Sequence, residues 1–469
     1  MKNIIIIISD EHRRDAMGCM GHELVKTPHL DQLAMGGTMF RRGYTASPMC
    51  VPTRAALATG TYVHQNKCWD SATPYDGRQP SWMHMLRDHG YHTASIGKLH
   101  FLAGADHGFT EEILPMHVHG PGWLVGLLRD ELPDYDGASE LAKDIGSGES
   151  SYTNYDLDIT SAAETWLADP ARHDKPFAGF ISLVSPHYPL VAPEDYYNMY
   201  DPDQMPVPPS FEHTHAEICN MAGFFNYHDH FDATRAQQAI ASYYGLTSFM
   251  DTCVGRIMKA VDSAGLRDDT LIIYTSDHGE LLGDHGLWTK QFMFEASAGI
   301  PMILSGKNIP QNKVSDQGVH LLDIPATILE IAGMTKPMDW PGENLVNIAN
   351  APHDDLSRPC FSEYHDGGST TGSFMVAWEH WKLIWYAGME PLLFDLRHDP
   401  AEEHNLAHDP AYQAVLESGK THLWQICDPE VVSQSALKDQ KHKMESVGGR
   451  EACINSFQFN ATPIPEFNT

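Results

Sequence analysis

Two runs of branched apolar residues, at 3–9 and 270–276, dominate the hydrophobic pattern of the chain. Such continuous runs are typical of strands that are buried on both faces of a parallel sheet. Shorter apolar runs predict further strands at 91–97, 178–184 and 301–304. Apolar residues at helical spacing predict helices at 81–89, 159–167 and 234–264. This alternation favours an α/β fold with a large, mostly parallel mixed sheet flanked by helices.

The pattern changes after residue 346, where the sequence turns polar until about 358. Short alternating runs then predict an antiparallel sheet from strands at 373–378, 381–386 and 391–395. We therefore expect a catalytic domain at 1–350 and a smaller C-terminal α+β subdomain at 351–469. Residues 103–155 and 198–232 are interpreted as loops, and residues 445–469 as a tail without periodicity. This tail is a candidate arm through which a homo-oligomer would form.

Polar side chains follow the two most apolar strands directly. Asp10 and Glu11 come after the first strand, and Asp277 and His278 come after the second. Open α/β sheets place ligands beyond the carboxyl ends of their strands. Adjacent carboxylates suit a hard cation such as Ca²⁺ or Mg²⁺, to which an imidazole can be added. The alternative is that these residues only cap the following turns.

A cysteine and an arginine lie one helical turn apart at the start of a predicted helix. Pro52 suits the first turn, and the run from Ala55 to Ala58 is strongly helix-forming. Cys50 then lies at the positive end of the helix, and Arg54 can reach back toward it. The alternative is a buried cysteine that caps the helix, with Arg54 in a surface ion pair.

Further basic side chains follow two other strands. Lys98 and His100 alternate at the end of the strand at 91–97 and could share one face. His187 lies between Pro186 and Pro189, just past the strand at 178–184. The alternatives are a solvated strand end and a structural histidine.

Several of these segments together resemble the type I sulfatases of the alkaline phosphatase superfamily. The segments are Cys50-Val51-Pro52-Thr53-Arg54 with Thr59-Gly60, residues 27–34, Gly97-Lys98-Leu99-His100, and residues 275–290 with Asp277-His278-Gly279-Glu280 and Gly283 to Lys290. The resemblance also includes residues 323–329 and the segments at 393–400 and 403–406. It implies an alkaline phosphatase-like fold over nearly the whole chain.

The resemblance also implies roles for individual residues. Cys50 would be oxidised to Cα-formylglycine by a formylglycine-generating enzyme or an equivalent, and the hydrated aldehyde would be the nucleophile. One divalent cation, Ca²⁺ with Mn²⁺ as the alternative, would bind Asp10, Glu11, Asp277, His278 and residue 50. Lys98 and Lys290 would bind the sulfate group, and His187 would bind substrate and protonate the departing alcohol. His100 would assist release of sulfate, and Arg54 would hold the geometry of the nucleophile.

Charge and cysteine content limit the kinds of partner and the cell compartment that we expect for this chain. The chain has 31 basic and 62 acidic residues, a formal net charge of −31, which argues against nucleic acid and anionic membranes as partners. Eight scattered cysteines show neither a zinc spacing nor a C-x-x-C motif, so reduced thiols are expected. The apolar run at residues 4–8 is too short for a signal peptide or a membrane span. These features predict a cytoplasmic protein, or a periplasmic one if a leader was removed.

The sequence thus predicts a sulfatase that hydrolyses a small-molecule or saccharide sulfate monoester to an alcohol and sulfate. One alternative is a phosphonate or phosphate ester hydrolase on the same scaffold, because the transferred groups have similar shape and charge. Another alternative is a silent sulfate-ester-binding protein with unmodified Cys50. The identity of the alcohol, whether choline, aryl or carbohydrate, stays open.

Overall fold

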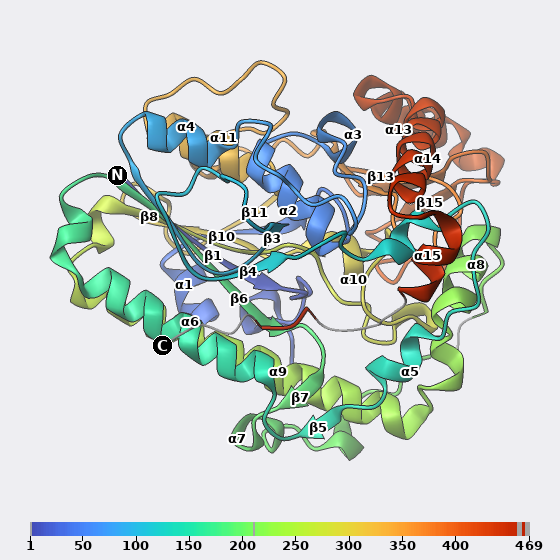
Figure 1. The fold of residues 1–469 in the computed structure, drawn as a ribbon, viewed down its shortest axis with the longest axis horizontal. Coiled ribbons are helices and arrows are strands. Elements are labelled where there is room, and N and C mark those ends of the chain that lie inside the picture. Colours follow the sequence, from blue (N-terminus) through green and yellow to red (C-terminus); the bar gives the residue numbers. More distant parts are fainter. Residues whose placement is uncertain (1, 210–211, 457–461, 465–469) are drawn as a thin grey trace.

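A mixed β-sheet forms the centre of the computed structural model, which describes residues 2–209, 212–456 and 462–464 (Figure 1). Within these residues the sheet has nine strands in the order β11-β2-β10-β8-β1-β6-β3-β4, with β9 paired to β2. Strand β9 is antiparallel to β2, and β10 is antiparallel to both β2 and β8. All other neighbouring strands are parallel, which confirms the predicted mostly parallel mixed sheet. Its strands are β1 (Asn3–Asp10), β2 (Gly37–Tyr44), β3 (His92–Leu102), β4 (Glu111–Val118), β6 (Phe177–Pro186), β8 (Thr270–Ser276), β9 (Gly299–Ile300), β10 (Met302–Ser305) and β11 (Lys313–His320).

Helices cover both faces of this sheet (Figure 1). Successive side chains of β1 point to opposite faces, so Ile6 packs in one core with α2, α4 and α11, and Ile7 packs in another with α1, α6 and α9. This two-sided burial explains why the strand carries no polar alternation. The helices are α1 (Pro28–Met35), α2 (Cys50–Thr59), α3 (Val63–Asn66), α4 (Trp82–Asp88), α5 (Gly137–Leu141), α6 (Ser151–Ala168), α7 (Glu194–Tyr197), α8 (Ala216–Phe225), α9 (Ala233–Ser263), α10 (Glu295–Ala298), α11 (Asp323–Ile331), α12 (Leu345–Asn350), α13 (Gln413–Ile426), α14 (Pro429–Ser446) and α15 (Gly449–Asn455).

A second, four-stranded sheet lies in the C-terminal part of the chain. Its antiparallel strands are β12 (Cys360–Tyr364), β13 (Ser373–Trp378), β14 (Trp381–Tyr386) and β15 (Leu392–Asp395). Leu416 and Leu423 of α13 pack against its apolar residues Phe374 and Leu383. The predicted antiparallel sheet is confirmed, with β12 as an additional strand. The proposed domain boundary at 350/351 falls directly after α12.

Two segments that were predicted as loops contain regular structure. The segment 103–155 holds β4, α5, the short strand β5 (Ile145–Ser147) and the start of α6. Strand β4 is the edge strand next to β3, and its charged residues and Pro115 hide the strand pattern, as is common at sheet edges. The segment 198–232 holds α8, whose buried Ile218, Met221 and Phe225 follow helical spacing over only ten residues. Strand β5 pairs with β7 (Leu190–Ala192).

The predicted tail at 445–469 is partly helical, because α14 continues to Ser446 and α15 follows it. Residues 457–461 and 465–469 of this tail lie outside the described residues. Within the described part, the Tyr152 hydroxyl donates to the Thr462 carbonyl at 2.8 Å, and Ile464 packs against the core beside α6. These contacts are made with the same chain, and assembly through the tail stays a prediction. None of the helices among the described residues is long and apolar enough to cross a membrane.

Gly97 offers a test of how closely β3 and β6 must approach. Its φ is +101°, and a Cβ atom would lie 2.3 Å from the Ser182 carbonyl oxygen of β6. Gly104 has a similar φ of +83° but open space around it. We therefore expect Gly97→Ala to lower the free energy of unfolding by about 1–3 kcal/mol more than Gly104→Ala, measured by urea denaturation. Equal losses in the two variants would contradict this reading of the strand contact.

Candidate active site

Four potential metal ligands meet where β1, β8 and α2 come together. Strands β1 and β8 are parallel neighbours with Ser9 opposite Ser276, so the residues that follow them share one edge of the sheet. The donor atoms of Asp10, Cys50, Asp277 and His278 all lie within 4.8 Å of one another. Cys50 Sγ is 3.6 Å from Asp10 Oδ1 and 3.1 Å from His278 Nε2. The structure therefore brings together the two strand ends, as the sequence predicted.

The His278 ring is oriented as a metal-binding imidazole usually is. Its Nδ1 lies 3.0 Å from the Gly279 carbonyl oxygen, so Nδ1–H donates there. The lone pair of Nε2 then faces Cys50 and the two carboxylates. A ligand imidazole is commonly fixed by such a hydrogen bond from its other nitrogen. With two carboxylates and this nitrogen, the donor set fits one divalent cation.

Arg54 is buried beneath this site and holds both carboxylates. Its Nε donates to Asp277 Oδ2 at 2.8 Å, and its Nη2 donates to Asp10 Oδ2 at 3.0 Å. Its Nη1 donates to the Lys98 carbonyl oxygen at 2.9 Å. Arg54 is only 1% exposed, so the alternative of a surface ion pair is wrong. Because Arg54 binds the Oδ2 atoms, the Oδ1 atoms of both carboxylates face the other candidate ligands, Cys50 and His278.

Lys98 and His100 of β3 approach the site from the other side of Asp10. Lys98 Nζ lies 2.6 Å from Asp10 Oδ2. Burial alone would raise the pKa of Asp10, but Lys98 and Arg54 outweigh it and hold that pKa well below its usual range. Burial, reinforced by Lys98 and Arg54, lowers the pKa of His100 well below its usual value. Its imidazole is therefore neutral, and neither ring nitrogen has a hydrogen-bond partner among the described residues.

The predicted alternation of Lys98 and His100 is irregular in the structure. The pairing register of β3 with β4 shifts between Ile96 and Lys98, and His100 has a φ of +56°. Lys98 and His100 nevertheless both reach the surroundings of Asp10, so the backbone between them departs from a regular strand while the two side chains stay at one site. Sequence reasoning missed this because a bulge depends on the neighbouring strand.

His187 and Lys290 form a pair opposite Lys98. His187 Nδ1 lies 2.7 Å from the Tyr188 carbonyl oxygen and donates to it, so Nε2 is the acceptor for Lys290 Nζ at 3.0 Å. Burial and then Lys290 and Lys98 lower the pKa of His187 well below its usual value, which keeps this ring neutral. The preceding backbone is fixed by Asp156, which accepts the N–H groups of Val184 and Ser185 at 2.7 Å each. Asp156 was not singled out from the sequence.

Glu11 lies beside the four-donor group but faces Lys290. Its Oε2 is 2.7 Å from Lys290 Nζ and 3.3 Å from His187 Nε2, and its backbone φ is +66°. Burial, with Glu280 adding to it, raises the pKa of Glu11 to about 8 against the opposing effect of Lys290. Direct ligation of a cation by Glu11 stays a prediction.

Glu280 is a supporting residue to which sequence reasoning gave no role, although it lies in the motif Asp277-His278-Gly279-Glu280. Its carboxylate accepts the N–H of Leu282 at 2.8 Å and the N–H of Thr289 at 2.6 Å. These bonds fix the loop that carries Lys290. The Lys290 ammonium group lies over the Tyr188 ring, with Nζ 5.2 Å from the ring centroid.

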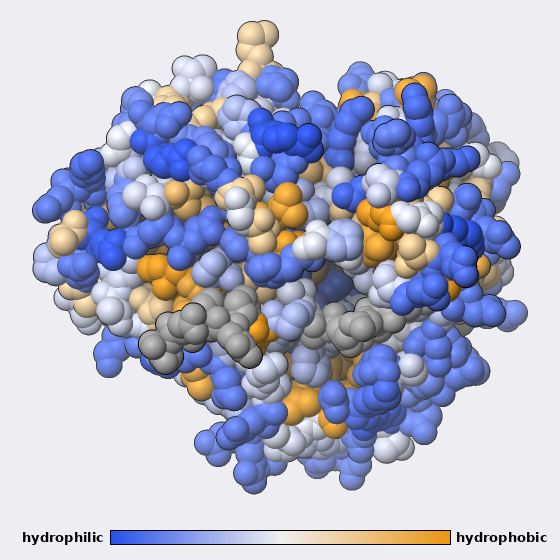
Figure 2. Space-filling model, viewed as in Figure 1, coloured by the Kyte–Doolittle hydropathy of each residue, from blue (hydrophilic) through white to orange (hydrophobic). Residues whose placement is uncertain are grey.

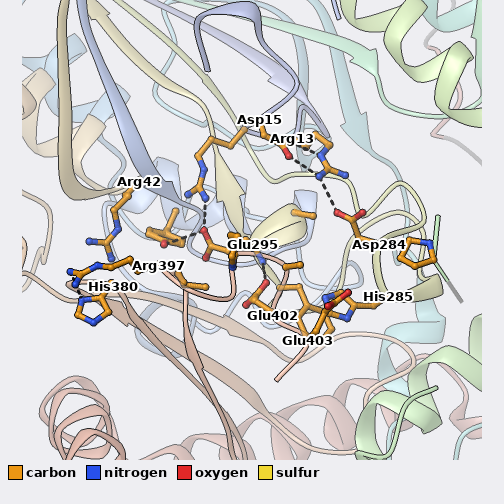
Figure 3. Close-up of a pocket in the computed structure, with 18 of the residues that line it drawn as sticks. Arg13, Asp15, Arg42, Asp284, His285, Glu295, His380, Arg397, Glu402 and Glu403 are labelled. Carbon is orange, nitrogen blue, oxygen red and sulfur yellow. Dashed lines mark hydrogen bonds and ion pairs between the residues drawn. The ribbon is translucent and has the colours of Figure 1, made fainter. Parts of the chain in front are cut away.

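A pocket of about 470 Å³ lies beside the site, and none of the predicted site residues lines it (Figure 3). On one side of it, Arg13 points toward Asp284 of the loop that leads to Lys290, with Nη2 3.0 Å from Oδ2. Arg14 pairs with Glu295 in the same pocket. Because Arg13 and Arg14 lie three and four residues after β1, these ion pairs connect the segment that follows that strand to residues on both sides of Lys290 in the sequence. Figure 2 shows that mostly hydrophilic side chains cover the face of the molecule seen there.

The sulfatase family model matches residues 2–334, which is most of the chain. The chain belongs to the sulfatase family. A second model, for the C-terminal region of N-sulphoglucosamine sulphohydrolase, matches residues 283–428. The family assignment confirms the resemblance seen in the sequence, and this sulfatase-family chain is a hydrolase of the alkaline phosphatase superfamily.

Named relatives and a solved structure agree with the family. A choline-sulfatase from Rhizobium meliloti is 29% identical over 444 residues, which cover 87% of this chain and 83% of that protein. Arylsulfatase K from Mus musculus is 28% identical over 441 residues, which cover 86% of this chain and 76% of that protein. The structure of a phosphonate monoester hydrolase of Agrobacterium radiobacter matches with a TM-score of 0.73 and 24% identity, over 91% of this chain and 95% of that one. This last match supports the fold of the sulfatase-family chain.

Cation binding should depend on Asp277 and not on a nearby exposed carboxylate. We expect Asp277→Asn to weaken binding of Ca²⁺ or Mn²⁺ at least about 100-fold, since loss of a mere supporting hydrogen bond to a ligand costs roughly 10–100-fold. Asp284→Asn, on the same loop but paired with Arg13, is the matched control and should keep wild-type affinity. Bound metal per chain after equilibrium dialysis is the measurement. Equal affinities in the two variants would remove Asp277 from the ligand set.

Proposed function

We propose that this chain hydrolyses a sulfate monoester to an alcohol and inorganic sulfate, using a formylglycine made from Cys50 and one divalent cation. The observation that carries this proposal is the position of Cys50, at the start of α2 and within 4.8 Å of the ligand atoms of Asp10, Asp277 and His278. A covalent nucleophile at this position would face both the cation and the basic groups of the site. Sulfatase-family membership and relatives named choline-sulfatase and arylsulfatase K support the sulfate ester as substrate.

The charge of the site supports an anionic substrate. Three cationic side chains, Arg54, Lys98 and Lys290, face the carboxyl groups of Asp10, Glu11 and Asp277. Arg54 and Lys98 offset the charges of Asp10 and Asp277, and the raised pKa of Glu11 reduces the negative charge opposite Lys290, so a bound divalent cation would make the site positive. Such a cation would stabilise negative charge on the transferring group. Ca²⁺ suits the carboxylates, and His278 makes Mn²⁺ a second candidate.

Unmodified Cys50 is a poor candidate for the nucleophile. Burial, with Asp10 adding to it, raises the pKa of its thiol to about 12, and a protonated thiol attacks slowly. A formylglycine would instead supply a hydroxyl of its hydrated aldehyde. Because the Cys50 side chain is 5% exposed, a maturation enzyme would have to reach it before the chain is fully folded.

The protons of the reaction have defined places in this site. Departure of the alcohol requires a proton on its oxygen, and the Lys290–His187 pair holds one between Nζ and Nε2, 3.0 Å apart. Release of sulfate requires removal of a proton from the group at position 50. The neutral His100 can accept it, because both of its ring nitrogens lack a partner among the described residues. Lys98 and Lys290 would bind the sulfate oxygens and stabilise charge as it develops.

The nature of residue 50 can be measured directly. Conversion of the Cys50 thiol to an aldehyde makes the intact protein about 18 Da lighter than its sequence. We expect this mass in the active fraction, and we expect Cys50→Ala to abolish turnover. Cys253→Ala, at another buried cysteine, should keep both the lighter mass and the activity. Turnover by Cys50→Ala would exclude the formylglycine mechanism, and an unmodified mass with sulfate-ester binding but no turnover would favour a silent binding protein.

A phosphonate ester is the second candidate substrate, favoured by His278 in the ligand set and by the fold shared with a phosphonate monoester hydrolase. Turnover of 4-nitrophenyl sulfate and 4-nitrophenyl phenylphosphonate, which share a leaving group, separates the two. We expect kcat/KM to be at least about tenfold higher for the sulfate. The ratio of the two kcat/KM values reports how much better the site stabilises one transition state than the other. Cys50→Ala supplies the background rate. A higher kcat/KM for the phosphonate would reverse the assignment. If the sulfate is preferred, a panel of choline, aryl and sugar sulfates identifies the alcohol.

A further inference from the structure

A second cluster of potential metal-binding side chains lies at the edge strand β4, which is the neighbour of the strand that carries Lys98. Glu112 and His117 belong to the edge strand β4, and His107 lies in the connection that precedes it. His107 Nδ1 is 2.9 Å from Glu112 Oε1, and His117 Nε2 is 2.8 Å from Glu112 Oε2. The donor atoms of all three residues lie within 4.8 Å of one another. None of them belongs to the site around Cys50.

The surroundings of His107 specify what its ring can donate. Its Nε2 lies 3.0 Å from the Leu102 carbonyl oxygen, and its Nδ1 faces the Glu112 carboxylate. A neutral imidazole has a single N–H and cannot donate to both acceptors. The ring is therefore either an imidazolium, or it donates Nε2–H to the carbonyl and gives the Nδ1 lone pair to a metal ion. The second arrangement is the one that His278 shows, with its ring nitrogens exchanged.

The other two residues fit the same ion. His117 Nδ1 makes no hydrogen bond among the described residues, so nothing prevents Nε2 from presenting its lone pair. The His107 side chain is 1% exposed, whereas Glu112 is 24% exposed and gives the cluster access to solvent. A bound ion would replace the two hydrogen bonds to Glu112 by bonds of about 2.0–2.2 Å.

We infer that His107, Glu112 and His117 bind a transition-metal ion of the Zn²⁺ class. Two imidazoles and one carboxylate are a ligand set for Zn²⁺, with a fourth position left for water. Ca²⁺ is excluded at this cluster by its need for six to eight oxygen ligands. The ion would be a clamp on β3 and β4, because His107 also holds the Leu102 carbonyl of β3.

This clamp would act on the strand that carries two residues of the candidate active site. Met116, next to His117, is paired with Lys98 in the β3–β4 register, and Leu102 is paired with Val118. The pairing register of β3 with β4 shifts on both sides of Lys98. A metal bond across the end of this pair would fix the position of the irregular strand end.

Zn²⁺ itself is the probe for this site. The purified full-length chain is stripped with chelator and dialysed against Zn²⁺, and bound zinc per chain is measured for wild type, His117→Gln and Glu112→Gln. The matched control is His119→Gln, which changes an exposed histidine two residues further along. We expect wild type and His119→Gln to bind one Zn²⁺ more than the two cluster variants. Zn²⁺ should also raise the unfolding temperature of wild type and His119→Gln by more than that of either cluster variant.

Cobalt distinguishes this site from the centre around Cys50. Co²⁺ in a four-coordinate site gives visible absorption bands, which we expect in Asp277→Asn and not in the double variant Asp277→Asn with His117→Gln. Circular dichroism of the metal-free variants establishes that each is folded, and Glu112→Gln keeps the size of the side chain if His117→Gln does not fold. Equal zinc content in wild type and both folded cluster variants would overturn the inference. It would leave an imidazolium–carboxylate network as the role of these residues.

Discussion

The arrangement of two buried carboxylates around one guanidinium determines where everything else in the active site can lie. Asp10 and Asp277 follow neighbouring parallel strands and are both fully buried, so their negative charges are close together in a poorly solvated region. Arg54 donates to one oxygen of each, which offsets that repulsion. Removing one partner from a buried ion pair commonly costs about 3–5 kcal/mol, because the remaining charge stays buried. The site therefore depends on Arg54 for stability as well as for geometry.

Arg54 also links this electrostatic constraint to the position of Cys50. It lies one turn after Cys50 in α2, so the ion pairs that hold Arg54 fix the start of the helix. The same guanidinium donates to the Lys98 carbonyl of β3 and to the Ser182 hydroxyl of β6. One side chain thus connects the ends of β1, β8, β3 and β6. A change in any of these strand ends would move residue 50 relative to the proposed cation ligands.

The parts of this fold that could be predicted from sequence are those whose burial leaves a local trace. Strands β1 and β8 are apolar throughout because both of their faces are covered, and the 31-residue helix α9 is long enough for its periodicity to be clear. Strand β4 and helix α8 were missed because an edge strand carries charges and a short helix has few repeats. The bulge at Gly97 and the support given by Asp156 and Glu280 depend on contacts between distant segments. Motif residues such as Lys290 were identified by resemblance, whereas their partners were visible only in three dimensions.

The contrast between a net charge of −31 and a site for an anion is resolved by distance and burial. Charges on the outer surface act through solvent, where salt screens them over about 8–10 Å. The active-site groups are at most 6% exposed and lie 2.6–3.9 Å from their partners, where screening by solvent is weak. At 4 Å and an effective dielectric constant of 20, one pair of unit charges interacts by about 4 kcal/mol. A bound divalent cation, together with the buried basic side chains, would therefore outweigh many surface carboxylates once the substrate has entered. The acidic surface acts earlier, on approach, where it disfavours polyanions as a class more strongly than it disfavours a single sulfate ester, because long-range repulsion grows with the charge of the ligand.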